Sequence, residues 1–186
     1  MDNFDEFLKK HGPPIHSKPA ATKTLAAYKK LLPAELVEMW KERGFCGYAK
    51  GFIWVVDPDE LVDVMKDWFP RSKERKIPIL RTAFGDLVFW DKGGAHLLDV
   101  QHGDVHDIVN DVSVLFWYWL CDKKVLDKVL EYPRFKKALL KYGSLGPDEC
   151  YAFKLALALG GDDSVNNMAK VKLREQLSIL SQVARS

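Results

Sequence analysis

Apolar residues recur at helical spacing along the N-terminal part of the chain. Those around Phe4 predict a short helix that ends at Gly12, followed by an extended, proline-containing connection over 13–22. The same spacing predicts two further helices, one over 25–32 and one that starts at Pro33 and ends at Gly44. Because glycine is common directly after a helix, Gly12 and Gly44 both serve as stop signals.

The pattern changes from strand to helix at Asp57-Pro58. An apolar run rich in β-forming residues over 52–56 predicts a strand. Asp57 has the chemistry of an N-cap, Pro58 suits the first helical position, and Glu60 resembles the second half of a capping box. We therefore expect one helix from Asp57 to about Phe69, with its apolar face towards the core.

Short β-like runs separated by turn residues cover residues 77–109. Their even spacing favours an antiparallel meander over parallel βαβ units. Within this region, the segment over 82–86 could be read as a ligand-binding loop. Turn chemistry explains it more simply, with Gly85 supplying a positive φ and Asp86 bonding the backbone, while Phe84 and Trp90 enter the core.

Helical spacing returns beyond Asn110, with a break expected near Cys121, and a last helix is predicted over 171–184. Aromatic residues over 116–120 would lie on all sides of a helix, so at least one is expected to be exposed. Residues 151–159 alternate with a period of two, which leaves strand and helix both open.

These elements predict an α+β fold with a central antiparallel meander sheet, helices packed on it, and a helical C-terminal part. We expect an α/β part over 1–109 and a mainly helical part over 110–186, packed as one compact unit. At 186 residues the chain is long enough to bury a proper core.

Composition narrows the class of protein. A formal net charge of +2 is too balanced to indicate a nucleic-acid binder or an acidic mimic of DNA. The three cysteines lie far apart and form no CxxC pair, a pattern typical of reduced thiols in the cytoplasm. The N-terminus has acidic residues where a signal peptide needs a basic region, and no apolar run is long enough to span a bilayer. We expect a soluble, cytoplasmic protein.

One candidate metal site lies in the meander. His102, Asp104 and His106 alternate, so a strand would point all three side chains to one face, where they could bind a transition metal. The competing interpretation is a hairpin turn at 101–104 with His106 on the adjoining strand. Because no third strong ligand is identifiable, we predict no metal and no cofactor.

Catalytic motifs are absent from the sequence. It contains no GxSxG, no HExxH and no glycine-rich phosphate loop, and nothing marks a nucleophile. A triad assembled from distant residues stays open, with the His102 region as its best starting place. We predict that the protein is not an enzyme.

An acidic stripe is the most suggestive surface feature. Asp59, Asp63 and Asp67 stand at i, i+4 and i+8, with Glu60 beside them, so a continuous helix would carry them on one face. The simpler interpretation is a solvated face, and the functional one is a docking site for a basic partner surface. Acidic residues at 99, 104, 107 and 111 would extend this face if the fold brought them beside that helix.

Four motifs, in this order along the chain, carry a resemblance to a known family: LLPAELVEMWKERGF (31–45), GFIWVVDPDEL (51–61), RTAFGDLVFW (81–90) and YGSLGPDECYAFKLALALGG (142–161). Over nearly the whole chain, the sequence resembles bacterial GAD-like proteins, which pair a GAD-like N-terminal segment with a C-terminal immunity domain against type VI secretion DNase effectors. Ala152, Lys154 and Ala156 depart from the family pattern, where a glycine, a small apolar residue and a proline are expected, so the identity of the partner does not transfer.

The resemblance implies an immunity protein that binds and neutralises a cognate type VI secreted DNase by protein–protein interaction. Its partner would be the nuclease effector, with Asp59, Glu60, Asp63 and Asp67 as candidate contact residues, no membrane association and no direct binding of nucleic acid. The alternative is a nucleic-acid-associated or translation-linked module, suggested by the GAD name and by a basic loop over 71–76. An enzyme of unrecognised type is the third hypothesis.

Overall fold

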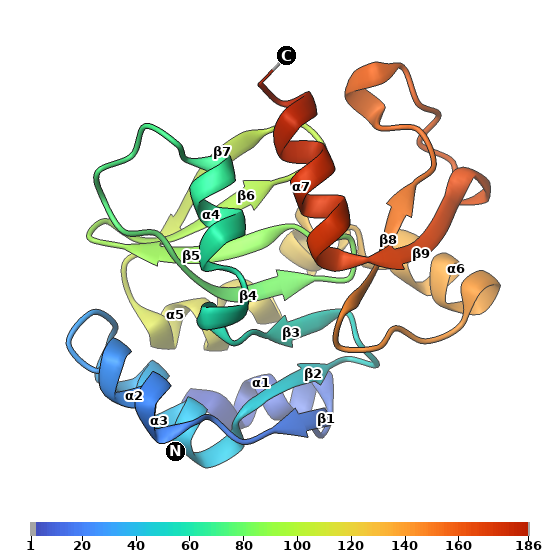
Figure 1. The fold of residues 1–186 in the computed structure, drawn as a ribbon. Helices are drawn as coiled ribbons and strands as arrows, with labels where there is room; N and C mark the ends of the chain where they lie inside the picture. The colour runs from blue at the N-terminus through green and yellow to red at the C-terminus, as the bar shows by residue number, and fades with distance from the viewer. Residues whose placement is uncertain (1–2, 186) are drawn as a thin grey trace.

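A seven-stranded antiparallel sheet forms the centre of the computed structural model, which describes residues 3–185 (Figure 1). Its strands lie side by side in chain order, each antiparallel to the next. The predicted meander is confirmed and is longer than expected. The strands are β1 (Ile15–Lys18), β2 (Phe45–Tyr48), β3 (Ile53–Val55), β4 (Ile77–Thr82), β5 (Leu87–Asp91), β6 (Gly94–Asp99) and β7 (Asp104–Val109).

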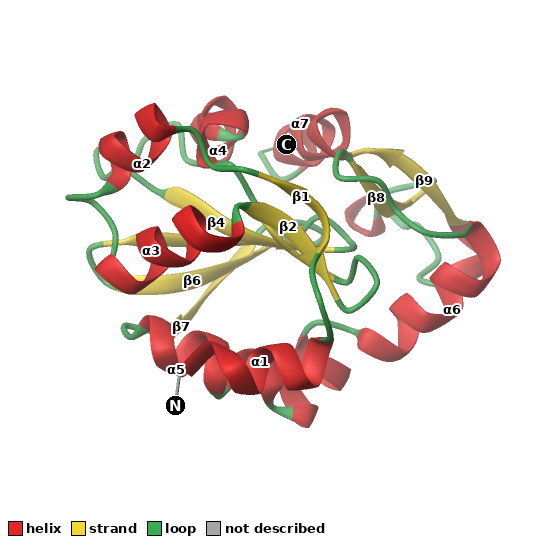
Figure 2. Cartoon of the chain, turned by 90° about the horizontal axis from the view of Figure 1, so that it is seen from below, coloured by secondary structure: helices red, strands yellow, loops and turns green. Residues whose placement is uncertain are grey.

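Helices cover both faces of this sheet, which confirms the α+β class. In Figure 2, α1 and α5 lie on one side of the sheet, whereas α4 and α7 lie on the other. Gly12 and Gly44 follow α1 and α3 with positive φ angles of 79° and 72°, as their stop signals predict. The helices are α1 (Asn3–His11), α2 (Thr22–Tyr28), α3 (Ala34–Arg43), α4 (Val62–Trp68), α5 (Val112–Trp117), α6 (Tyr132–Tyr142) and α7 (Leu173–Val183).

The expected single helix from Asp57 to Phe69 is wrong, because the chain breaks at Leu61. A 3-10 turn over Pro58–Glu60 comes first, with Asp57 accepting a hydrogen bond from the Asp59 N–H as the predicted N-cap. Leu61 then leaves the helical region at φ −124°, and α4 starts one residue later. The side chain of Leu61 is buried in a cluster with residues of α7, so tertiary packing favours the break.

The second half of the chain begins with short helical pieces. A 3-10 turn over Trp119–Cys121 and a π-helical turn over Val125–Val129 separate α5 from α6, so the break expected near Cys121 is confirmed. The segment over 151–159 divides into the end of strand β8 (Glu149–Phe153) and a 3-10 turn over Leu157–Leu159. β8 pairs with β9 (Met168–Lys172), a strand that the sequence did not predict.

Arg81 joins the central sheet to the second half of the chain. Its buried guanidinium lies 4.6 Å from the centre of the Trp54 ring and donates a hydrogen bond of 2.9 Å to the Pro147 carbonyl. Beside it, the Tyr151 N–H donates to the Ala83 carbonyl at 2.8 Å. The largest buried apolar cluster likewise draws residues from both halves.

Candidate functional site

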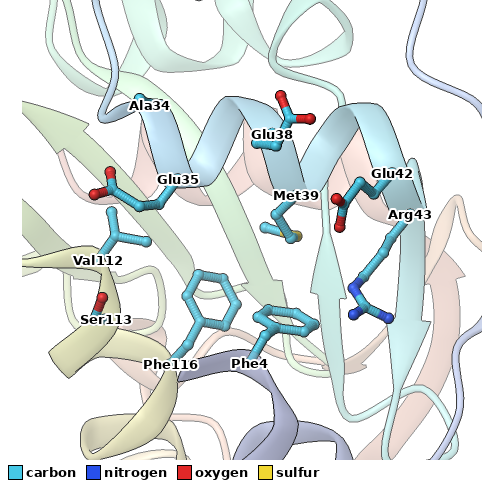
Figure 3. Close-up of a pocket in the computed structure, with 10 residues that line it drawn as sticks. All are labelled: Phe4, Ala34, Glu35, Glu38, Met39, Glu42, Arg43, Val112, Ser113 and Phe116. Atoms are coloured by element: carbon cyan, nitrogen blue, oxygen red, sulfur yellow. The ribbon is translucent and has the colours of Figure 1, made fainter. Parts of the chain in front are cut away.

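A groove with an apolar floor lies between α3 and α5, next to α1. Its cavity is about 490 Å³. Figure 3 shows Phe4, Met39 and Phe116 at its centre, with Glu35 at one end and Glu42 with Arg43 at the other. Pockets of this size, with apolar floors and a few charged groups at the edge, are typical of binding sites.

The sequence of α3 explains why one helix supplies both acid and apolar side chains. Leu36, Met39 and Trp40 form its buried stripe. The acidic residues Glu35 and Glu42 stand on the exposed side at i and i+7. The helix therefore anchors itself through one face and presents carboxylates to solvent along the edge of the groove.

The opposite wall comes from α5 and α1. Asp111 caps α5 by accepting a hydrogen bond of 3.0 Å from the Val114 N–H. Phe116 then packs its ring 5.0 Å from that of Phe4 and 5.4 Å from that of Phe7, measured between ring centres. The floor of the groove is thus the outer edge of the hydrophobic core, so its shape is held by core packing.

The charges around the groove are unequal. Glu38 points away from the floor in Figure 3 and forms an ion pair of 2.7 Å with Lys41. Arg43 lies with its guanidinium 5.0 Å from the centre of the Phe4 ring. Glu35 and Glu42 form no ion pair within the part of the chain that the structure describes. An apolar floor between two unpaired carboxylates suits a basic, partly apolar segment of another protein.

The predicted acidic stripe is not one surface, and this part of the prediction is wrong. Asp59 turns towards α2, where its carboxylate accepts hydrogen bonds from the Thr24 hydroxyl at 2.8 Å and the Tyr28 hydroxyl at 2.9 Å. Burial, and then Asp59, raise the pKa of Tyr28. The break at Leu61 places Asp59 on the 3-10 turn rather than on α4, so the spacing that defined the stripe does not apply.

The remaining members of that stripe differ in their contacts. Glu60 pairs with Lys18 at 2.6 Å. Asp63 pairs with Arg174 of α7, which holds the pKa of this carboxyl below its usual value. Asp67 is exposed, and its side chain makes no hydrogen bond or ion pair among residues 3–185. Three of the four carboxylates are therefore already bound within the protein.

Three acidic residues of the meander, Asp91, Asp99 and Asp107, have local partners as well. His96 lies between Asp91 and Asp107, with its ring nitrogens 2.8 and 2.7 Å from the two carboxylates. Asp99 bonds His102 at 2.7 Å and raises the pKa of that imidazole. Asp99 and Asp107 are therefore paired with histidines of the meander itself. They do not extend the acidic stripe.

His102 lies in the turn before β7, whereas Asp104 and His106 belong to the strand itself. Gly103 has a φ of 75°, so the hairpin interpretation is confirmed. Within residues 3–185, no group of three or more His, Cys, Asp or Glu side chains is placed to hold a metal ion.

The basic loop over 71–76 is partly tied to the protein. Arg75 donates to the Tyr28 hydroxyl at 3.1 Å and lies 4.8 Å from the centre of that ring. Lys76 pairs with Asp91 at 2.9 Å. Only part of this loop's positive charge is therefore free to meet a phosphate backbone.

Two smaller predictions are confirmed. The segment over 82–86 is a turn, with Gly85 at φ 92° and Phe84 buried. Among the aromatic residues over 116–120, Trp117 and Tyr118 are exposed at 53% and 61%. The sequence reasoning missed the groove, although a signal was present in Glu35 and Glu42, which stand at i and i+7 on either side of Met39 along one edge of the apolar stripe of α3.

Two family models match this chain, one to each part of it. Residues 2–102 match the model of the GAD-like domain, and residues 114–184 match that of the T6SS immunity protein Tdi1, C-terminal. The fold is similar to the crystal structure of Atu4351 from Agrobacterium tumefaciens, at a TM-score of 0.78 and 19% sequence identity, over 96% of this chain and 88% of that one. No curated protein matches the chain.

No helix within residues 3–185 is long and apolar enough to cross a membrane. The first family match covers more than half of the chain and includes the strands β1 to β6 of the central sheet. The second begins in α5, which forms one wall of the groove, and ends directly after α7. The chain therefore belongs to the GAD-like domain family, and its C-terminal part matches that of a type VI secretion immunity protein.

Proposed function

We propose that this protein is an immunity protein that binds a cognate type VI secreted DNase in the cytoplasm and neutralises it by protein–protein contact. The observation that carries the proposal is the match of residues 114–184 to an immunity-protein domain. The role is one of binding, without chemistry of its own. Neutralisation would follow from covering the nuclease surface that meets DNA.

The groove between α3 and α5 supports this proposal through its charge. A nuclease that binds DNA needs a basic surface, because the phosphate backbone supplies most of the non-specific binding energy. Glu35 and Glu42 are exposed at the edge of the groove, and the apolar floor lies between them. Opposite charges of this kind speed association, and the apolar centre provides the area that excludes water.

The carboxylates predicted from the sequence stay a separate proposal for the contact surface. Asp67 tests that proposal best, because it is exposed and has no internal partner in the described part of the chain. Replacing Asp59, Glu60 or Asp63 would also break contacts within the protein, so a loss of binding there would have two causes.

A nuclease encoded beside this gene would provide the test, since an immunity gene has to be inherited with its toxin. We expect the two proteins to purify together and the mixture to lose DNA cleavage at equimolar concentration. A nuclease that remains fully active with excess partner would contradict the proposal. A gel-shift assay at low salt without the nuclease tests the alternative, because a nucleic-acid-associated module would retard DNA or RNA by itself.

A further inference from the structure

A second cleft lies where the two matched segments meet. Its cavity is about 510 Å³ and is lined on one side by Phe84, Asp86 and Gln101, and on the other by Trp119 and Tyr151. The first three residues belong to the GAD-like match and the last two to the immunity-type match. Apolar and polar side chains contribute about equally to the lining, which also includes the cations Lys128 and Arg134. Neither cation forms an ion pair with Asp86 among residues 3–185.

Asp86 is the unusual group in this cleft, because it has no cationic partner. Its carboxylate accepts hydrogen bonds from the Thr82 hydroxyl at 2.9 Å and the Val100 N–H at 3.2 Å. No ion pair to Asp86 occurs among residues 3–185. Burial raises the pKa of this carboxyl to about 6, and the charges of Asp99 and Glu131 add to the effect.

The neighbouring acids are already paired, which sets Asp86 apart. Asp99 bonds His102, and Glu131 pairs with Arg134. Both carboxylates still add to the negative potential around Asp86. A buried carboxylate that lacks a counter-charge is costly in the free protein, so a cation entering the cleft would be favoured.

Gln101 provides an independent indication of the ligand. Its side-chain oxygen is buried and has no hydrogen-bond partner in the part of the chain that the structure describes. An unpaired buried acceptor has a cost that a donor from a ligand would remove. A ligand with hydrogen-bond donors would therefore suit both Asp86 and Gln101, and a positive charge on that ligand would also neutralise Asp86.

We propose that this cleft binds a guanidinium group, with Asp86 and the Gln101 side-chain oxygen as acceptors and the aromatic wall at Trp119 as the apolar contact. A guanidinium is planar, carries several donors in fixed directions and stacks on aromatic rings. The site is separate from the groove between α3 and α5, and the inference does not depend on the identity of the nuclease.

Calorimetric titration with n-butylguanidine tests the chemistry, with the neutral n-butylurea as matched control. We expect a Kd of about 1 mM or below for the guanidine and at least tenfold weaker binding for the urea. Binding should also shift the indole N–H resonance of Trp119, identified with a Trp119→Phe variant. Equal binding of both compounds, or no binding of the guanidine at about 10 mM, would overturn the proposal.

Two variants locate the site. Asp86→Asn keeps the shape and an acceptor oxygen, so it should fold and yet bind n-butylguanidine at least about tenfold more weakly, because charge-assisted hydrogen bonds are the strong ones. Gln101→Leu should weaken binding of n-butylguanidine by a smaller factor. It tests the same site if Asp86→Asn does not fold. Asp107→Asn, at the exposed edge of the same cleft and paired with His96, should change affinity less than twofold. Unchanged binding by both Asp86→Asn and Gln101→Leu would exclude the site.

A second titration, with a short peptide, distinguishes the possible sources of the guanidinium. Acetyl-Gly-Arg-Gly-amide carries it as a protein side chain, and the citrulline version of the same peptide is the uncharged control. Binding of the arginine peptide alone assigns the cleft to a side chain of a partner protein. Binding of n-butylguanidine alone assigns it to a small molecule, and either result supports the proposed chemistry.

Discussion

Two acidic regions of this protein look alike in sequence and differ in structure. The first is formed by Asp59, Glu60, Asp63 and Asp67, and the second by Glu35 and Glu42 of α3. Three carboxylates of the first region are bound by Thr24, Tyr28, Lys18 and Arg174, whereas the two glutamates face solvent at the edge of an apolar groove.

The difference arises from what packs against each helix. α4 lies beside α7, so Asp63 of α4 meets Arg174 of that helix. Glu35 and Glu42 of α3 are exposed and form no ion pair among residues 3–185, although Lys41 and Arg43 of the same helix are basic. A carboxylate contributes most to binding a partner when it has no ion pair in the free protein. If it already has one, binding only replaces one ion pair with another, and the net gain in free energy is small.

The groove depends on its aromatic floor, and removing that floor should have the largest effect. Phe116→Ala deletes a ring that is 2% exposed and packs on Phe4, so unfolding free energy should fall by about 3–5 kcal/mol. Urea denaturation measures this loss. Leu140→Ala, at a side chain 89% exposed, is the matched control and should change it by less than about 0.5 kcal/mol. A loss below about 1 kcal/mol for Phe116→Ala would show that the floor is not core.

Charge reversal on α3 compares the two regions directly. The pair Glu35→Lys and Glu42→Lys should weaken binding of the nuclease about 100-fold at moderate salt, because like charges would then face each other. Asp67→Lys and the control Glu175→Lys, both exposed, should each change affinity less than about threefold. Surface plasmon resonance measures the dissociation constants. A larger loss of affinity for Asp67→Lys than for the α3 variant would favour the acidic stripe predicted from the sequence as the contact surface.

Asp59 should matter for stability rather than for binding. Asp59→Ala removes the acceptor for two hydroxyls, one of them on the buried Tyr28, and should lower the free energy of unfolding by about 1–2 kcal/mol. Asp67→Ala should leave it within about 0.5 kcal/mol. Thermal and urea unfolding of both variants would measure the difference. Equal stability for the two would mean that the contacts of Asp59 contribute nothing.

The ion pair of Asp63 with Arg174 should have the smallest effect. Its side chains are 61% and 52% exposed, so solvent screening limits the contribution to about 0.2–1 kcal/mol. Because the folded pKa of Asp63 is lowered, this stability is present above pH about 4 and is lost as the pH falls through the folded pKa. The difference between wild type and Asp63→Asn should therefore shrink in acid and in about 1 M salt. A difference that persists under both conditions would contradict an exposed ion pair.

Much of the fold could be predicted from local patterns. The turns around Gly85 and Gly103, the N-cap at Asp57 and the stops at Gly12 and Gly44 each depend on a few neighbouring residues, and all occur as expected. By contrast, β1, β2 and β9 were not predicted, because they are short strands whose residues are held mainly by pairing with distant segments. Pairing across the sheet overrides weak local preference in such cases.

The sequence by itself determined the α+β class, the meander and the absence of catalytic motifs, because spacing and turn chemistry act over a few residues. Only the tertiary structure decided which charges are free. Whether Asp59 meets Tyr28, or Asp86 goes without a cation, depends on side chains far along the chain that folding brings together. Charge availability is a property of three-dimensional neighbours, which is why the groove and the second cleft became visible only after the helices were placed.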